Sequence, residues 1–422
     1  MKLRSGYKQT DIGVLPKDWS ISRVGDEALK VGSGITPTGG ESVYQREGRP
    51  FVRSQNVGWG ELLLNDVAYI SNELHESFAS TEIKVDDVFL NITGASIGRS
   101  AVADARVANG NVNQHVCIVR PKKKSLNARF LNYILLSGLG QRQIDSFQAG
   151  GNRQGLNFEQ IRSLELPVPQ LDEQRAIAAA LSDTDAFINS LDRLLAKKRD
   201  IKQAVMQQLL TGKQRLPGFS GVWDVKRLSE LGYTFGGLTG KTKTDFGEGV
   251  AKYIPFLNII KNVVVDPLSL ERVIVAPAEV QNLVAKGDLF FNGSSETPEE
   301  VGMCSVLLER MHNTYLNSFC FGYRLKEGAK ASGIYLAYYF RSNEGRKLVF
   351  SLAQGATRYN LSKTNFLKLA IPFPELSEQT AIAAVLSDMD AEIDALIQRR
   401  DKTRAIKQGM MQELLTGRTR LI

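Results

Sequence analysis

Cysteine and histidine are scarce in this sequence, and their scarcity argues against two kinds of site. The 422 residues include three Cys and three His. The cysteines, Cys117, Cys304 and Cys320, are scattered and form no Cys-x-x-Cys pair, and there is no His-Glu-x-x-His motif. The sequence therefore predicts neither a disulfide framework nor a metal site.

Long hydrophobic runs are also missing. No uncharged apolar stretch approaches the roughly 18 residues that a membrane-spanning helix needs. The basic N-terminal segment has no apolar stretch behind it, unlike a secretory signal. We expect a soluble protein of a reducing compartment. The 53 Lys and Arg against 45 Asp and Glu give a net charge of +8, which fits either a polyanionic partner or simple solubility.

Motifs for catalysis or cofactor binding are incomplete. The string GGLTGKT at 236–242 resembles a phosphate-binding loop, but Phe235 stands where the first glycine is required. Asp66, Glu82 and Lys84 are the nearest approach to a nuclease set, and the second half of the chain has no counterpart. No Asn/Asp-Pro-Pro-aromatic loop for methyl transfer to a base is present. We expect no catalytic residues, no cofactor and no metal.

An internal repeat is the main positive signal. Residues 168–216 align without a gap on residues 373–421, an offset of 205, and 28 of the 49 positions are identical. The preceding regions match only at separate points: Trp19 and Trp223, Arg23 and Arg227, Gly32 and Gly236, Asp87 and Asp288, Phe89 and Phe290, Asn91 and Asn292, Asn113 and Asn317, Arg120 and Arg324, Gly150 and Gly355, Arg153 and Arg358, and Leu156 and Leu361. We predict two variable heads, residues 1–167 and 216–372, each followed by a constant segment, residues 168–215 and 373–422.

The heads have the patterns of mixed α and β structure. Strands are expected in 50–57, 86–93 and 114–120 of the first head, and in 252–259, 287–293 and 317–325 of the second. Amphipathic helices are expected at 126–138 and 331–342. The predicted fold class is α+β, with two mixed α/β domains and two long antiparallel helices.

The constant segments have the heptad spacing of helices that pair with another helix. The predicted seam consists of Ile177, Leu181, Ile188, Leu191 and Leu195 in one copy and Ile382, Leu386, Met389, Ile393 and Leu396 in the other. Asp172 and Ser377 are candidate N-caps, and Gly212 and Gly417 supply the C-terminal stops. About 40 residues give a rod of roughly 60 Å. The alternative is that each helix packs only on its own head.

Basic residues interrupt both seams at the same place. They are Lys197, Lys198 and Arg199 in one copy, and Arg399, Arg400, Lys402 and Arg404 in the other. The seam is expected to resume with Ile201, Val205 and Leu209, and with Ile406, Met410 and Leu414. The basic run is either a solvated face or a surface for phosphates or a partner.

Connectivity constrains how the helices pair. The second head begins just after the first helix ends, and the second helix begins just after that head. If the seams pair, the helices run antiparallel, and the C-terminus returns to the first head.

Polar side chains that can pair with base edges or phosphates are frequent in the predicted loops. The candidates are Arg53, Gln55, Asn56, Asn113, Gln114, Asn152, Arg153 and Gln154 in the first head, and Asn258, Lys261, Asn262, Asn317, Arg358, Tyr359 and Asn360 in the second. Arg153 and Arg358 are the most specific, because they occupy matching glycine-containing loops just before the constant segments.

Three repeated motifs together point to one family. They are the LPKDW and LPGFSGVW head starts at 15–19 and 216–223, the EQxAIA helix entrances at 173–178 and 378–383, and the LLTG helix exits at 209–212 and 414–417. The chain resembles the specificity subunit of type I restriction-modification systems along essentially its whole length.

The resemblance implies a function in DNA recognition. The heads would be target recognition domains, each reading one half of an asymmetric bipartite site, and the helices would set the spacer. The implied partners are double-stranded DNA, two methyltransferase subunits and the restriction subunits, in the cytoplasm of a prokaryote. The chain itself would be non-catalytic. A self-contained nuclease or methyltransferase and a coiled-coil interaction scaffold are the alternatives.

Overall fold

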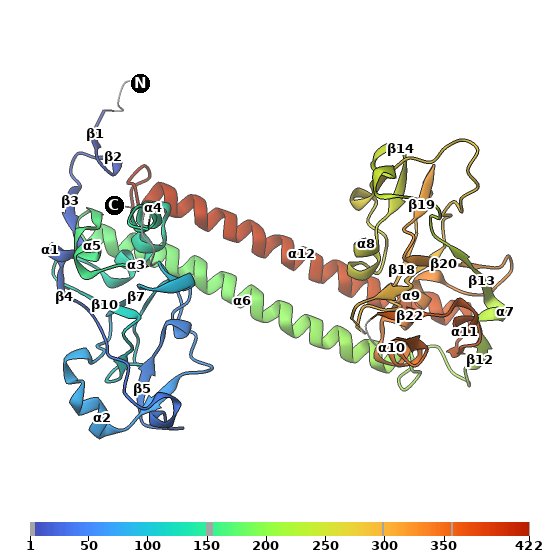
Figure 1. Cartoon of the computed structure of the whole chain (residues 1–422), viewed down its shortest axis with the longest axis horizontal. Coiled ribbons are helices and arrows are strands. Elements are labelled where there is room, and N and C mark those ends of the chain that lie inside the picture. The colour runs from blue at the N-terminus through green and yellow to red at the C-terminus, as the bar shows by residue number, and fades with distance from the viewer. Residues whose placement is uncertain (1–4, 149–154, 298, 356–357, 422) are drawn as a thin grey trace. The chain divides into compact units, whose positions relative to one another are not determined.

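Two compact units make up the chain, and each contains one head together with parts of both long helices. The computed structural model describes residues 5–148, 155–297, 299–355 and 358–421 (Figure 1). The first unit consists of residues 1–191 and 399–422, and the second of residues 192–398. The beginning of one long helix and the end of the other therefore belong to each unit.

The first unit combines short strands with small helices around the start of a long helix. Its elements are β1 Tyr7–Thr10, β2 Gly13–Pro16, β3 Ser20–Arg23, α1 Val24–Glu27, β4 Ala28–Ser33, β5 Arg49–Val52, β6 Ala68–Ile70, α2 Asn72–Ser77, β7 Val88–Asn91, β8 Ser100–Val102, β9 Asn111–Val112, β10 Val116–Pro121, α3 Ala128–Leu136, α4 Gly138–Ser146, α5 Phe158–Ser163, β11 Glu165–Val168 and the long helix α6 Leu171–Leu209.

An antiparallel sheet in the order β4-β10-β7-β8 forms the centre of this unit, beside a smaller sheet in the order β6-β5-β9. Alternate residues of β7 point to opposite faces. Val88 and Leu90 join the core that includes α3 and the start of α6, whereas Phe89 joins the core toward Val52 and the smaller sheet. Both faces of the central sheet are therefore buried.

The second unit repeats this plan. Its elements are β12 Asp224–Arg227, α7 Leu228–Leu231, β13 Gly232–Gly236, β14 Phe246–Ile254, α8 Phe256–Lys261, β15 Glu271–Val273, β16 Leu289–Asn292, β17 Ser294–Ser295, β18 Cys304–Val306, β19 Thr314–Leu316, β20 Cys320–Leu325, α9 Gly333–Arg341, α10 Asn343–Phe350, β21 Ala353–Gln354, β22 Tyr359–Leu361, α11 Lys363–Leu367, β23 Ala370–Phe373 and the long helix α12 Leu376–Leu414. The sheet orders β13-β20-β16-β18 and β15-β14-β19 match those of the first unit strand for strand.

The same ion pair supports both central sheets. Arg120 on β10 holds the buried Asp87 with Nε and Oδ1 2.7 Å apart, and Arg324 on β20 holds the buried Asp288 at the same distance. The hydrogen bond to the carboxylate raises the pKa of each arginine. The points at which the two head sequences match are thus the points that fix the common framework.

The predicted strands and helices of the heads are confirmed, with two corrections at their ends. Strand β5 ends at Val52, and residues 54–56 form a short 3-10 helix, so the predicted strand is too long. Strand β14 ends at Ile254, and α8 begins directly after Pro255. The side chains of Asn56 and Asn258 bond the local backbone at both places, and such bonds favour turns over strands.

Helices α6 and α12 each have 39 residues, or about 58 Å at the rise of an α-helix. The predicted N-caps are wrong, because α6 begins at Leu171 and α12 at Leu376, so Asp172 and Ser377 lie within the first turns. The helix exits are confirmed. Gly212 and Gly417 have φ values of +69° and +66°, which glycine adopts without strain.

The residues of the first part of the predicted seam are buried or half-buried. Of its predicted continuation, Leu209 and Leu414 are buried and Val205 and Met410 half-buried, and only Ile201 and Ile406 are wrong. The buried seam residues are Ile177, Leu181, Ile188, Leu191, Leu195, Ile382, Leu386 and Ile393, while Met389 and Leu396 are half-buried. Ile201 and Ile406, where we expected the seam to resume, are 40% and 50% exposed. The adjacent Lys202 and Lys407 turn inward in their place, because each finds a carboxylate on the other helix.

Those lysines establish that the helices run antiparallel. In the first unit Lys407 Nζ lies 2.6 Å from Asp185 Oδ1, and in the second Lys202 pairs with Asp390. A residue near the start of one helix is thus opposite a residue near the end of the other.

A cluster of four residues closes the first unit at the chain ends. Trp19 Nε1 donates to Glu173 Oε2 at 3.1 Å, and the Arg420 guanidinium bonds both Glu173 and Asp18. Tyr7 also donates to the carbonyl of Gly417 at 2.9 Å. The predicted return of the C-terminus to the first head is confirmed.

The second unit has the matching cluster. Its arginine follows α6, whereas the arginine of the first cluster follows α12. Trp223 Nε1 donates to Glu378 Oε2 at 3.0 Å, and Arg215, just beyond the end of α6, bonds the same carboxylate. Each repeat therefore supplies the arginine that completes the other repeat's cluster.

Neither a membrane-spanning helix nor a metal-binding cluster occurs among the described residues. No helix among them has a window long and apolar enough for a membrane span. No group of three or more His, Cys, Asp or Glu side chains comes together there as a metal site would require.

Candidate nucleic-acid interface

In the first unit, three candidate loops meet on the segment 91–93 at the end of β7. The Asn91 amide donates to the carbonyl of Ser54 at 2.8 Å. Ile92 N–H donates to the carbonyl of His115 at 3.1 Å, and the Ile92 carbonyl accepts from Leu156 N–H at 2.9 Å. We call this meeting point the loop junction; it joins segments 53–56, 113–115 and 155–156.

The first loop junction presents polar side chains. Gln55 and Gln114 are exposed, and His115 is half-buried, with Nδ1 2.7 Å from the Thr93 hydroxyl. Arg53 is half-buried beside Tyr44 and lies 3.4 Å from Asp66 Oδ2. Gln55 donates to that same carboxylate at 2.7 Å. Donors and acceptors of both kinds are therefore within one corner of the head.

Two predicted candidates of the first head shape the loops with their side chains. Asn56 is buried, and its amide donates to the carbonyls of Leu63 and Asp66. Asn113 is also buried and accepts from His115 N–H at 3.1 Å. Asn152, Arg153 and Gln154 lie outside the described residues.

The second unit has a loop junction at the same place, on segment 292–294 at the end of β16. Gly293 N–H donates to the carbonyl of Phe319 at 2.9 Å, and the Gly293 carbonyl accepts from Leu361 N–H at 3.0 Å. Ser294 pairs with Asn360 in the small sheet β17-β22-β21. Asn317 N–H donates to the carbonyl of Ile254 at 3.1 Å, which brings the start of α8 to the same corner.

The second loop junction presents an aromatic ring and a cation. Phe319 is 52% exposed, and the Arg358 guanidinium lies over its ring, with 5.3 Å from Cζ to the ring centroid. Asn360 and Lys261 are exposed, and Tyr359 is half-buried. The two heads therefore place different chemistry on a common frame.

The asparagines of the second head again hold backbone. Asn258 is buried and donates to the carbonyl of Asp266 at 2.9 Å, while Asn262 donates to Asn258 Oδ1 at 3.0 Å. The amide oxygen of Asn317 accepts from Phe319 N–H at 2.9 Å. These side chains fix the loops from which Lys261 and Phe319 project.

Three side chains that lie at the loop junctions or hold the end of α8 were not among the predicted candidates. His115 and Phe319 follow predicted residues by one or two positions. Arg341, at the end of α9, donates to the carbonyls of Ile260 and Cys304 and to others at the end of α8. Alignment of the repeats could have revealed it, because a charge at 341 stands opposite an aliphatic residue at 136. Burial lowers the pKa of Arg341. The surrounding carbonyls oppose this shift, because they accept hydrogen bonds from the charged guanidinium.

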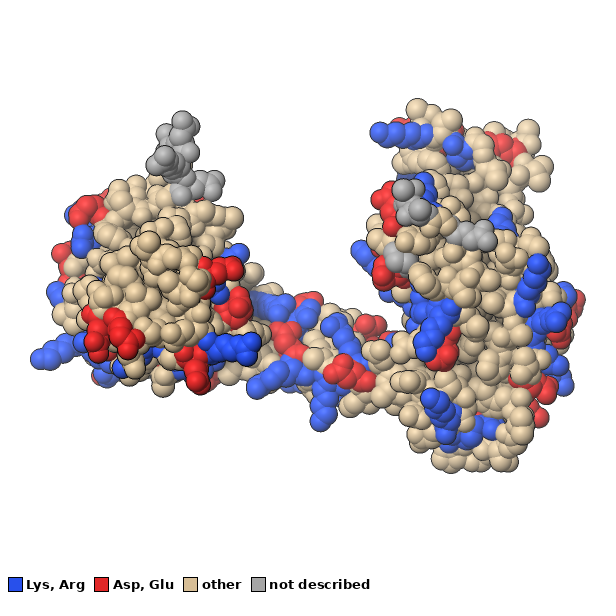
Figure 2. Space-filling model, turned by 60° about the horizontal axis from the view of Figure 1, so that its bottom comes forward, with Lys and Arg blue, Asp and Glu red and all other residues tan. Residues whose placement is uncertain are grey.

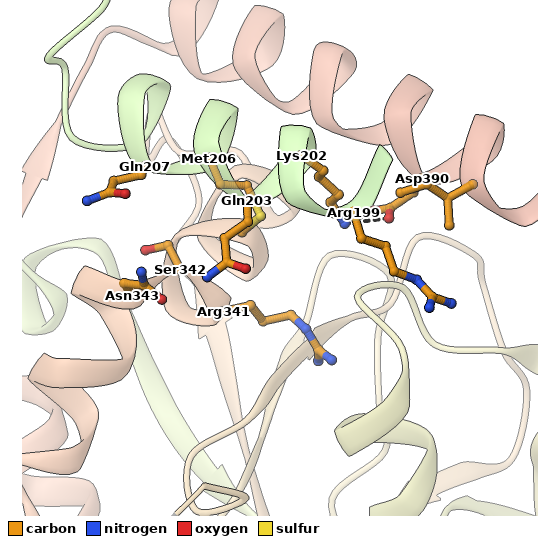
Figure 3. A pocket seen from close by; sticks show the side chains of 10 residues that line it. Arg199, Lys202, Gln203, Met206, Gln207, Arg341, Ser342, Asn343 and Asp390 are labelled. Carbon is orange, nitrogen blue, oxygen red and sulfur yellow. Dashed lines mark hydrogen bonds and ion pairs between the residues drawn. The ribbon is translucent and has the colours of Figure 1, made fainter. Parts of the chain in front are cut away.

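A matched contact fixes each head to the helix pair. Tyr133 donates to Asp185 Oδ2 and Tyr338 to Asp390 Oδ2, both at 2.8 Å. In the second unit this contact borders an open cavity of about 430 Å³ between α6, α12 and the α9–α10 turn (Figure 3). Figure 3 shows Lys202 directed at Asp390 within it. In each unit the head therefore packs directly on the pair of long helices.

Only part of the predicted basic run faces solvent. Lys198 pairs with Glu392 at 2.6 Å, and the Arg399 guanidinium lies over the Phe187 ring. The exposed members of the run are Lys197, Arg199, Arg399, Lys402 and Arg404. Figure 2 shows blue and red side chains interspersed along the long helices, which leaves a mixed surface with a basic excess.

The incomplete catalytic motifs have structural explanations. Lys241 of the GGLTGKT string pairs with Glu279. Asp66 accepts hydrogen bonds from the first loop junction. All three cysteines are buried, and burial raises the pKa of Cys117 and of Cys320 to about 12, so both thiols are protonated at neutral pH.

Comparison with known proteins agrees with the duplicated frame. Residues 16–199 and 222–404 each match the family described as the type I restriction modification DNA specificity domain. The chain belongs to this family. It is a specificity subunit of the type I restriction-modification kind.

Relatives align along the whole chain. A putative type I restriction enzyme MjaX specificity subunit of Methanocaldococcus jannaschii is 23% identical, covering 98% of this chain and 97% of the relative. The EcoKI specificity subunit of Escherichia coli is 22% identical, covering 96% and 89%.

Solved structures share the fold. One from a study of complex assembly and conformational transition of the type I R-M system has a TM-score of 0.61 at 18% identity, covering 96% of this chain and 99% of that one. The S subunit from M. genitalium has a TM-score of 0.56 at 14% identity, covering 98% of each chain.

Proposed function

We propose that this chain is the DNA-recognition subunit of a type I restriction-modification enzyme. Each head reads one half of an asymmetric bipartite site in double-stranded DNA, and the chain leaves methylation and cleavage to its partners. The observation that carries the proposal is the duplicated loop junction. The same framework presents Gln114 and His115 in one head but Phe319 and Arg358 in the other. Different exposed chemistry on equal frames suits two different half-sites.

The helix pair supports the second part of the proposal, which concerns spacing and partners. Helices of fixed length set the number of base pairs between the half-sites. Because the constant segments repeat, two identical methyltransferase subunits dock on equivalent surfaces, and the restriction subunits join through that assembly. Lys197 and Lys402, which are among the exposed members of the basic run, are candidates for contact with DNA phosphates or with these partners.

Exchange of one head tests the division of labour. Residues 216–372 are replaced by the second head of another specificity subunit, and methylated adenines are mapped across the host genome. We expect one half of the methylated sequence to change and the other to stay. A change in both halves, or in neither, would contradict modular reading.

Lengthening the helices tests the spacer. One helical turn is inserted after Leu195 in α6 and after the matching Arg400 in α12. We expect a longer spacer between unchanged half-sites in the same genome map. An active complex with the original spacer would refute the role of the helices as a ruler.

A further inference from the structure

The second loop junction contains an arginine that is held by an aromatic ring. The Arg358 Cζ atom lies 5.3 Å from the centroid of the Phe319 ring, and both side chains are exposed to solvent. Among the described residues, this guanidinium makes no hydrogen bond or ion pair besides its contact with the ring. Its N–H groups are therefore available to a ligand.

Gly293 joins the two segments that carry these residues through backbone hydrogen bonds. The Phe319 carbonyl accepts from Gly293 N–H at 2.9 Å, and the strand that begins at Tyr359 is tied to the Gly293 carbonyl through Leu361 at 3.0 Å. A Cβ atom on Gly293 would meet the Phe319 carbonyl oxygen at 3.0 Å, so the close approach favours glycine. The stacked pair therefore rests on a defined backbone.

Contact with the ring limits the positions that the guanidinium can take and leaves its N–H groups free. A planar fork of donors matches the O6 and N7 acceptors of guanine in the major groove, and this is the commonest base-specific contact of arginine. A phosphate contact needs charge but no fixed plane. In the first unit His115 stands at the position of Phe319 and interacts with Thr93, so this device belongs to one head.

We propose that Arg358 reads a guanine in the half-site of the second head, and that Phe319 is the positioning residue that orients its guanidinium. The proposal rests on the proposed function, since it assumes that this head binds DNA.

The test uses the full chain in complex with the methyltransferase subunits of its host. The complex selects from a pool of duplexes with randomised sequence, and the preference at each base pair is measured at several salt concentrations. The variants are Phe319→Ala, Phe319→Tyr and Arg358→Lys. Phe350→Ala is the matched control, because Phe350 is 50% exposed in the same unit but lies at the end of α10.

We expect the unaltered complex to select a bipartite site with a guanine in one half. Phe319→Ala and Arg358→Lys should reduce the preference for that guanine by roughly 10-fold or more and leave the other positions unchanged. Phe319→Tyr, which keeps the ring, should retain it, and so should Phe350→Ala. Arg358 is exposed, so Arg358→Lys remains informative if Phe319→Ala fails to fold.

Three results would overturn the proposal. One is a bipartite site whose base preferences do not respond to either substitution. Another is a uniform loss of affinity with a weaker salt dependence, which would mark Arg358 as a phosphate contact. The third is the absence of any bipartite preference in the unaltered complex, which would overturn the proposed function and this proposal together.

Discussion

At the residue scale, one hydroxyl distinguishes matching positions of the two heads. Tyr335 in α9 is fully buried and its oxygen has no hydrogen-bond partner among the described residues, whereas the first head has Phe130 at that position. A buried hydroxyl without a partner destabilises a fold. We expect Tyr335→Phe to raise the free energy of unfolding by up to about 1 kcal/mol.

Denaturant titration measures that change, and Tyr338→Phe is the control. Tyr338 lies one turn further along the same helix and donates to Asp390 at 2.8 Å. Its substitution should lower stability by roughly 2 kcal/mol, since it removes a hydrogen bond to a charged group. Equal losses from both substitutions would contradict our reading of Tyr335.

A second prediction at this scale concerns acid. The pKa of Glu279 is lowered from 4.5 to about 2, first because Lys241 donates to the ionised carboxylate and then because Ala276 N–H and the Gln281 amide donate to it as well. The unfolded state then binds a proton more readily than the folded state between these pH values, so this pair stabilises the fold above pH 4.5 and ceases to do so as the pH falls toward 2.

We expect Lys241→Met to flatten the dependence of stability on pH within that window. Circular dichroism during chemical denaturation at a series of pH values measures it. Lys347→Met, which removes a lysine paired with Glu344 on the surface, serves as the control. The same slope in the Lys241 variant and the parent would contradict the prediction.

At the scale of elements, a lysine bridges the long helices in each unit. Lys202 pairs with Asp390 and lies over the Tyr338 ring, and Lys407 makes the same contacts with Asp185 and Tyr133. Partly buried contacts of this kind fix the register of paired helices.

A double-mutant cycle tests the contribution of this contact. We expect Lys202→Met and Asp390→Asn to show a coupling energy of about 1 kcal/mol in the free energy of unfolding. The neighbouring exposed Ile201→Met should change stability by less than about 0.5 kcal/mol. A coupling energy near zero would mean that the lysine only fills space.

The sequence predicted these elements because their signals are local or repeated. The heptad spacing identified Ile177 and Leu181, and the repeat aligned Asp87 with Asp288. The direction of the lysine side chains was not predictable, because Ile201 fits the apolar period better and the carboxylate that attracts Lys202 lies 188 residues away. Which side chain faces the other helix is therefore determined by partners that are distant in the sequence.

The candidate loops for DNA binding were predicted from their polar composition. Which of their side chains face solvent was not predicted. Asn56 and Gln55 have similar side chains, yet the buried Asn56 amide bonds backbone carbonyls and Gln55 is exposed. Phe319 was not predicted as a candidate for DNA binding, because an aromatic residue near a strand is usually part of the hydrophobic core. Only its contact with Arg358 indicates a role in positioning that side chain.

At the scale of the whole molecule, the chain ends are neighbours within the first unit. Arg420 bonds Asp18, and Tyr7 bonds the carbonyl of Gly417. We expect a circular permutant, opened after Gly218 and joined across the old ends by a short Gly/Ser linker, to fold with stability within about 1 kcal/mol of the parent.

Thermal unfolding and the genome methylation map check the permutant. Both half-sites should be retained. A second permutant opened after Asn91, in the first loop junction, is the control and should fail to fold, because that segment is buried and joins three loops. Failure of the Gly218 permutant alongside a soluble Asn91 permutant would contradict the arrangement of the chain ends.

The exchange of arginines between repeats also sets an order of events during translation. The cluster of the second unit needs Arg215 and Glu378, both of which precede residue 399. The cluster of the first unit needs Arg420, which is synthesised after every residue of the second unit. The Arg420–Glu173 pair closes a loop of 247 residues and the Arg215–Glu378 pair one of 163 residues. The longer loop raises the entropic free-energy cost of closure by only about 0.4 kcal/mol. The first head to be synthesised is therefore the last to be completed, and a ribosome that stops early releases a chain whose second unit is finished and whose first is not.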